Sequence, residues 1–236
     1  MHHFMDKLVN KAIEKSQLSR VSKLQIKTHW APDIVISRDP GSGGHVIAKM
    51  IAKRLGWQLF DKSLMRKLSD ELQIPEAEVV DVDEHGRSWI SDFVHSIINP
   101  DYVSDIRYIT QLKKLLNHAA KKGDLVVIGH GANYILPPDK CLRIRITAPF
   151  NTRVDNTYKY ENFKSRFEAS QWVEKIEKQY NQFIRQYFGK NPHNPWDYDL
   201  VISTDHYTMS QVADLIIKAY LTKFPGEKKR LKLKIS

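Results

Sequence analysis

The segment from Ile34 to Gly56 constrains the fold of this chain more than any other. Ile34 to Ser37 is a short apolar run that predicts a buried strand, and the glycine-rich turn Pro40 to Gly44 cannot extend it. Apolar residues then recur at helical spacing from His45 to Leu55, and Gly56 is suited to end that helix in a left-handed turn. The segment therefore predicts a strand, a tight turn and a helix in direct succession.

The turn has the properties of an anion-binding site. Glycine permits positive φ and a close approach of the backbone to a ligand. Consecutive N–H groups in such a turn form a concavity that attracts anions, and the helix N-terminus behind it adds partial positive charge. No acidic residue lies within the turn. We therefore predict phosphate binding by Gly41, Ser42, Gly43, Gly44, His45 and Val46.

The rest of the chain alternates strand and helix patterns. Further strands are predicted at 57–60, 125–128, 142–146 and 198–202, and helical patterns at 62–122, 151–188 and 210–224, with breaks near Pro75 and Pro100. Strands separated by helices predict an α/β fold with a parallel sheet covered on both faces. Ligands of such sheets bind beyond the carboxyl ends of the strands, where the glycine turn lies.

The net charge of +10 is concentrated at the two ends of the chain. Residues 1–33 hold six basic and three acidic residues, residues 226–236 hold five and one, and residues 34–225 keep only +3. We expect a basic, helical N-terminal extension (1–33), a folded domain (34–225) and a frayed basic tail (226–236). Nucleic acid is one anionic partner that such ends could contact.

Several protein classes are excluded by composition. No apolar run reaches the roughly 18 residues that a membrane helix needs, and no secretory signal pattern opens the chain. Cys141 is the single cysteine, which rules out an internal disulfide and predicts a reducing, cytoplasmic setting. Oligomeric state is left open.

Two motifs resemble those of a known family. Ser37 to Ala48 (SRDPGSGGHVIA) and Val126 to Leu136 (VVIGHGANYIL) are similar to motifs of the cytidylate kinase-like family of P-loop kinases, and shorter matches extend the resemblance over residues 34–217. The resemblance implies a P-loop NTPase-type three-layer α/β/α fold with a five-stranded parallel sheet and a helical lid. It also implies transfer of the ATP γ-phosphate, with Mg²⁺, to a nucleoside monophosphate such as CMP or dCMP.

Individual residues of this chain are candidates for the roles that such a reaction needs. Arg38, Arg153 and Arg185 are predicted as catalytic cations, Asp39 as a metal ligand, and Asp61, His130 and Asn133 as acceptor contacts. Structural alternatives stay open: Asp39 suits a turn, Asp61 suits a helix N-cap, and His130 suits a strand end.

The chain departs from the family where the family keeps arginine. His45, His130 and Tyr180 stand at those positions, and the pattern Gly-x-x-x-x-Gly-Lys-Ser/Thr is absent. Histidine is mostly neutral at pH 7, and a transition-state arginine is worth about 10³-fold or more in rate. Three hypotheses therefore stay open: a nucleoside monophosphate kinase, a catalytically weakened nucleotide-binding module, and a nucleic-acid binder that acts through its basic ends.

Overall fold

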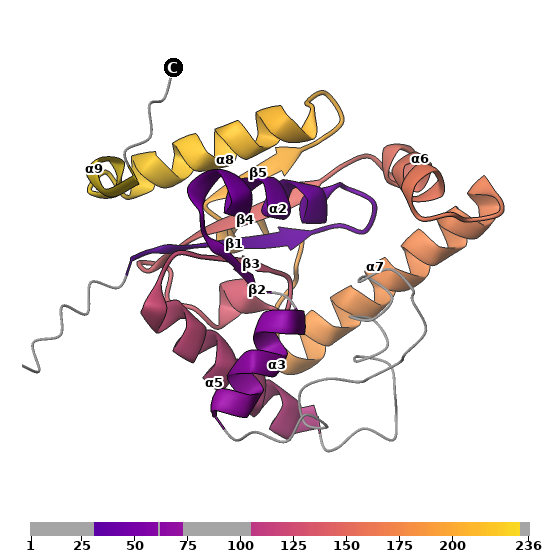
Figure 1. Ribbon diagram of the computed structural model, residues 1–236. Helices are drawn as coiled ribbons and strands as arrows, with labels where there is room; N and C mark the ends of the chain where they lie inside the picture. The colour runs from indigo at the N-terminus through magenta and orange to yellow at the C-terminus, as the bar shows by residue number, and fades with distance from the viewer. Residues whose placement is uncertain (1–30, 61, 73–104, 232–236) are drawn as a thin grey trace, which may run out of the picture. The chain divides into compact units, whose positions relative to one another are not determined.

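The computed structural model describes residues 31–60, 62–72 and 105–231 (Figure 1). Four parts of the predicted organisation lie outside the described residues: the N-terminal helix, Asp61, the breaks near Pro75 and Pro100, and the last five residues of the tail. None of the described helices is long and apolar enough to cross a membrane.

Five parallel strands form one sheet, in the order β2-β3-β1-β4-β5. Their bounds are β1 Asp33–Arg38, β2 Gln58–Phe60, β3 Leu125–Ile128, β4 Cys141–Thr147 and β5 Leu200–Ser203. All five predicted strands are confirmed, although the fifth begins at Leu200 rather than Tyr198. Central β1 is buried along nearly its whole length, as the short apolar run predicts.

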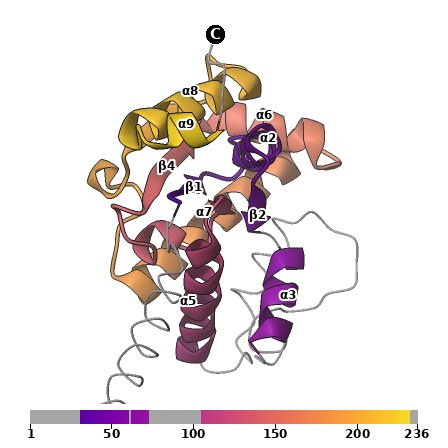
Figure 2. The same ribbon diagram turned by 60° about the vertical axis from the view of Figure 1, so that its left-hand side comes forward.

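Helices connect the strands and cover the sheet. They are α2 Gly44–Leu55, α3 Lys62–Glu71, α5 Asp105–Lys122, α6 Phe150–Tyr160, α7 Arg166–Phe188, α8 Met209–Lys223 and α9 Glu227–Leu231, with short 3₁₀ turns η2 Ala132–Tyr134 and η3 Pro195–Asp197. In Figures 1 and 2, α2 and α8 lie on one side of the sheet and α5 lies on the other. Helix α7 runs past the strand ends. The predicted layered α/β arrangement is confirmed.

One predicted helix is divided in two. The pattern 151–188 was expected to be continuous, but α6 ends at Tyr160 and α7 starts at Arg166. Asn162 adopts a left-handed φ of 55°, which breaks the helical path. Ser165 then caps α7 by accepting a hydrogen bond from the Glu168 N–H. The result is two separate helices that pack against each other through Val154, Ala169 and Val173, rather than one rod (Figure 1).

The main core fills the space between the sheet and the α2–α8 pair. Ile34, Ile36, Ile47, Ile51 and Ile216 are among its fully buried side chains. These residues come from β1, α2 and α8, so the core fixes α2 directly against the strand that precedes it. The helix that begins at the glycine turn therefore has a rigid base.

The start of the C-terminal tail is folded, so the expectation of a frayed end is wrong for residues 227–231. Glu227 is buried, and Arg230 pairs with it and with both carboxylate oxygens of Asp124. Asp124 lies in the turn between α5 and β3. The ion pairs therefore attach α9 to the far end of the sheet from the glycine turn.

Asp33, at the start of β1, makes the stability of the fold depend on pH. It is fully buried and accepts a hydrogen bond from the Leu125 N–H at 3.1 Å. Burial raises its pKa from 3.8 to about 8; the Leu125 N–H opposes that rise, and nearby Asp124 adds to it. The folded state thus keeps a proton that the unfolded state releases, so stability falls as pH rises from about 4 to about 8.

Asp33→Asn should remove this dependence. We expect the variant to gain stability relative to the native chain by about 1.4 kcal/mol for each pH unit within that window. Urea unfolding at pH 5 and pH 8 measures the difference. Asp139→Asn, which changes an exposed carboxylate, is the control. Equal pH dependence in the native chain and Asp33→Asn would contradict a neutral buried Asp33.

Candidate functional site

The glycine turn lies at the carboxyl end of β1 and leads directly into α2. Gly41 and Gly43 have φ values of 78° and 80°, and Gly43 forms the N-cap of α2. No side chain caps this helix end, and no acidic residue lies in its first turn. The amides at the start of α2 are therefore available for an anion in the way the sequence predicts.

The Ser42 side chain points inward and holds the turn together. Its hydroxyl donates to the Asp39 carbonyl at 2.7 Å, and its own carbonyl accepts from the Thr204 hydroxyl at 3.0 Å. Thr204 follows β5, so the turn is fixed to the end of another strand. The Ser42 N–H also donates to the Asp39 carbonyl, and Ser42 is not among the residues that line the cavity, so Ser42 stabilises the turn rather than contacting a phosphate.

Helix α6 packs tightly against the turn. The Asn156 amide donates to the Gly41 carbonyl at 3.0 Å. A Cβ atom at Gly41 would collide with the Arg153 carbonyl, and one at Gly44 would lie 2.7 Å from the Arg38 Cβ. Close packing therefore requires glycine at both positions, and Gly41 also has a left-handed φ of 78°.

A cavity of about 130 Å³ lies between the turn and the α6–α7 pair. It is lined by Arg38, Asp39, Pro40, Gly41, Gly43, Gly44, His45, Val46, Asn156, Thr157, Tyr160, Glu161, Ile176 and Tyr180. Among these described lining residues, Arg38 is the one arginine or lysine. Burial lowers the pKa of Arg38 to about 10, so its guanidinium stays charged at pH 7.

The two histidines at the family's arginine positions are neutral at pH 7. Burial, together with the positive charges of Lys49 and Arg38, lowers the pKa of His45 to about 4. Burial and Arg38 together lower the pKa of His130 to about 3. The His130 ring lies edge-on to Phe60, with 5.9 Å between ring centroids. Neither residue supplies the charge that an arginine would bring.

Two of the predicted catalytic arginines lie away from the cavity lining. Buried Arg153 donates to the Ala148 carbonyl at 3.1 Å and to Glu177 at 3.2 Å, so it joins α6 to α7. Arg185 is exposed on α7, in a shallow depression that it shares with Glu177 and Lys178. The structure brings Arg38, but not Arg185, to the glycine turn.

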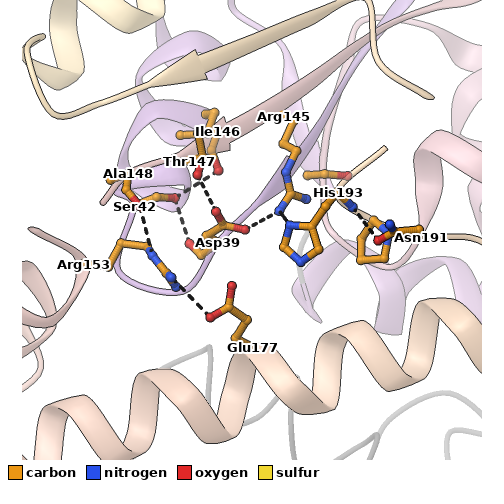
Figure 3. Close-up of polar contacts among 12 residues, drawn as sticks. Asp39, Ser42, Arg145, Ile146, Thr147, Ala148, Arg153, Glu177, Asn191 and His193 are labelled. Carbon is orange, nitrogen blue, oxygen red and sulfur yellow. Dashed lines mark hydrogen bonds and ion pairs between the residues drawn. The ribbon is translucent and has the colours of Figure 1, made fainter. Parts of the chain in front are cut away.

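The arrangement around Asp39 does not fit a magnesium ligand. Its Oδ1 accepts from Arg145 at 2.5 Å and its Oδ2 accepts from the Thr147 hydroxyl at 2.6 Å (Figure 3). The described residues contain no group of three or more His, Cys, Asp or Glu side chains that could hold a metal ion. Asp39 instead joins the turn to β4.

Asn133 lies near the carboxyl ends of β1 and β3. Its Oδ1 accepts from the Ser37 hydroxyl at 3.0 Å, whereas its buried Nδ2 makes no hydrogen bond within the described part of the chain. Asn133 therefore lies close to the turn, and its Nδ2 is a potential hydrogen-bond donor to a ligand. Its predicted acceptor role stays a prediction, as does that of Asp61.

Sequence reasoning missed Arg145, Thr147, Asn156, Thr204 and His193. Arg145 and Thr147 alternate with apolar residues in β4, and Arg145 lies opposite Ser37 in the β1–β4 register. That register places both side chains beside Asp39. Only the pairing of strands more than a hundred residues apart shows their relation to the turn, so no local signal identifies them.

The sheet order, the glycine turn between β1 and α2, and the cavity above it define a P-loop α/β protein of the kinase type. The family model for the cytidylate kinase-like family matches residues 33–206, and the chain belongs to that family.

Similar proteins agree with this assignment. The cytidylate kinase of Ignicoccus hospitalis is 22% identical over 172 residues, which cover 72% of this chain and 88% of the relative. The cytidylate kinase of Streptococcus gordonii is 23% identical over 211 residues, which cover 78% of this chain and 93% of the relative. A solved structure of an uncharacterized Eubacterium ventriosum protein matches with a TM-score of 0.59 at 22% identity, covering 81% of this chain and 98% of that one.

Proposed function

We propose that this chain transfers the γ-phosphoryl group of ATP to a nucleoside monophosphate, with CMP or dCMP as the leading acceptors. The observation that carries the proposal is the amide-lined glycine turn, which opens onto a cavity next to the charged Arg38. Family membership and the two cytidylate kinases among its relatives support the reaction class and the acceptor.

The glycine turn fits the phosphate groups of ATP. In this proposal the amides of Gly41, Gly43, Gly44 and His45 bind phosphate oxygens and Arg38 supplies positive charge beside them. Helices α6 and α7 supply one wall of the cavity, through Asn156, Thr157, Tyr160, Ile176 and Tyr180. The acceptor phosphate is already an anion, so it needs little proton removal, and positioning is the main task of the protein.

Asp39 is not among the residues that we propose as ligands for Mg²⁺. Mg²⁺ commonly keeps several waters and binds substrate phosphates with only one or two protein carboxylates. Because both Asp39 oxygens are engaged, we assign no step to the metal. ATP supplies the phosphoryl group when it is bound, and the chain's own residues orient it.

The neutral histidines favour a second candidate, a nucleotide-binding module with weakened catalysis. His45 lines the cavity at the start of α2, where an added cation would reach a phosphate. With His45 and His130 both uncharged at pH 7, the site offers less charge stabilisation than arginine would. This candidate predicts binding without turnover.

A coupled assay of ADP release with each common nucleoside monophosphate, at high enzyme concentration, separates the two candidates. A kinase gives turnover that is highest with CMP or dCMP, and His45→Arg raises its rate at least about tenfold. Thr222→Arg adds the same charge at an exposed position of α8 and should leave the rate unchanged. Thermal stabilisation by ATP without ADP release, in the native chain and in His45→Arg, would support the binding module instead.

Binding of nucleic acid by the basic ends stays a prediction, as does the division at residues 33 and 225. Within the described part of the tail, Arg230 is already paired with Asp124 and Glu227. Nucleic-acid affinity that falls steeply with salt, and that is lost in a chain of residues 34–225, would support this role.

A further inference from the structure

Three side chains from distant segments meet beside the glycine turn. Arg145 of β4 donates through Nη2 to Asp39 at 2.5 Å and lies 3.0 Å from the His193 Nδ1 through the same nitrogen. Figure 3 shows Arg145 between the two, with Asp39 on one side and His193 on the other. Asp39 starts the turn, and His193 lies between α7 and β5.

The Asp39–Arg145 pair is buried, which makes it sensitive to the loss of any partner. Arg145 is 4% exposed and Asp39 is 6% exposed. A buried ion pair is stable only when good geometry and further hydrogen bonds offset the loss of hydration. Thr147 supplies one such bond to Asp39, and His193 supplies the contact to Arg145.

The pair acts directly on the shape of the turn. The Asp39 N–H donates to the Ile146 carbonyl at 3.0 Å, and the Asp39 carbonyl accepts from both the N–H and the hydroxyl of Ser42. Backbone and side chain of Asp39 are therefore both attached to β4. Asp39 is the first residue of the turn, and the amides of the turn face the cavity. A shift of the Asp39 carboxylate would therefore move the start of the turn.

The contact with His193 requires one protonation state. Arginine can only donate hydrogen bonds, so the Nδ1 of His193 must accept. The imidazole is then neutral, with its proton on Nε2. A proton added to Nδ1 would place two donors, both charged, against each other and break the contact. The charged or titratable groups around Arg145 are Asp39 of the turn, Tyr180 of α7, and Tyr198 ahead of β5.

The segment that holds His193 has its own anchor. The Tyr198 hydroxyl donates to the Pro192 carbonyl at 2.8 Å, and the Arg145 guanidinium lies 5.8 Å from the centre of the Tyr198 ring. The His193 side chain is thus presented to Arg145 by a closed loop that follows α7. The contact between His193 and Arg145 therefore links the loop after α7 to the glycine turn.

We propose that Arg145 is a positioning residue for the glycine turn and that His193, as a hydrogen-bond acceptor, holds Arg145 in place. The importance of this arrangement for catalysis rests on the proposed phosphate binding by the turn. The arrangement itself depends only on the Asp39–Arg145–His193 geometry.

The test compares three variants of exposed histidines with the native chain. His193→Gln keeps an acceptor that does not titrate, His193→Ala removes the acceptor, and His206→Gln changes an exposed histidine away from Arg145. Protection of the Asp39 and Ser42 amides against hydrogen exchange is measured by NMR from pH 5 to pH 7.5 without nucleotide. The Kd for ATP is measured over the same range.

We expect the native chain and His206→Gln to lose about fivefold in amide protection as pH falls from 7.5 to 5, because a proton on Nδ1 breaks the contact with Arg145. His193→Gln should keep its pH 7.5 amide protection down to pH 5. His193→Ala should show, at both pH 5 and pH 7.5, the low protection that the native chain has at pH 5. Native-like protection in His193→Ala, or a retained pH dependence in His193→Gln, would overturn the proposal.

Arg145→Lys provides the second measurement. Lysine keeps the charge beside Asp39 but lacks the planar fork that arginine offers to two partners. We expect the KM for ATP to rise more than kcat falls, with amide protection like that of His193→Ala. Amide protection equal to that of the native chain in Arg145→Lys would contradict a positioning role for Arg145. If the native chain binds no ATP at all, the proposed function fails, while the exchange experiment still decides the positioning role.

Discussion

Gly41→Ala should reduce the affinity for ATP at least about 100-fold. Left-handed φ costs a residue with a side chain about 1–2 kcal/mol, and the new Cβ would also collide with the backbone carbonyl of Arg153. A backbone atom cannot rotate aside, so α6 must move away from the turn and the cavity must change shape. Isothermal titration with ATP measures the loss.

Gly56→Ala is the matched control for this change. Gly56 also has a left-handed φ, of 69°, but a Cβ there meets nothing within 4 Å. Gly56→Ala should therefore lower the melting temperature, because alanine is strained at this φ, and should leave the affinity for ATP unchanged. Equal affinities in Gly41→Ala and Gly56→Ala would show that the contact between the turn and α6 does not shape the site.

Arg38→Gln should weaken ATP binding about 100-fold. Arg38 is the cation of the cavity lining among the described residues, and a charge-assisted hydrogen bond contributes up to about 3 kcal/mol. Arg38→Lys keeps the charge and should recover part of the affinity. Because Arg38 stays protonated well above pH 7, the difference between native chain and variant should be constant from pH 6 to pH 8.

Arg54→Gln is the control for Arg38. Arg54 lies near the other end of α2 and pairs with Asp214 and Ser210 of α8. It should lose no ATP affinity. If Arg38→Gln binds ATP as well as Arg54→Gln while both remain folded by circular dichroism, then phosphate recognition does not use the cavity described above.

The sheet and the turn were predictable because their signals are local. Apolar runs of four or five residues mark the strands, and glycines at 41 and 43 take the positive φ that the turn requires. The break between α6 and α7 also has a local signal that was missed: Ser165 followed three residues later by Glu168 is a capping pattern.

The electrostatics of the site was not predictable in the same way. The partner of Asp39 is 106 positions away, and the partner of Arg153 is on another helix. The pKa values of His45 and His130 depend on how deeply each ring is buried and on the distance to Arg38. These quantities arise from strand register and helix packing, which sequence spacing does not specify.

The position of β1 in the centre of the sheet has a consequence for how the chain folds during synthesis. Both neighbours of β1 lie far downstream, since Ile34 pairs with Val126 of β3 and with Leu142 of β4. The ribosome makes the chain from the N-terminus, so the first strand and its glycine turn emerge about a hundred residues before either neighbour. β1 is thus made well before both of its neighbours in the sheet, and its two apolar edges stay unpaired until β3 and β4 are made.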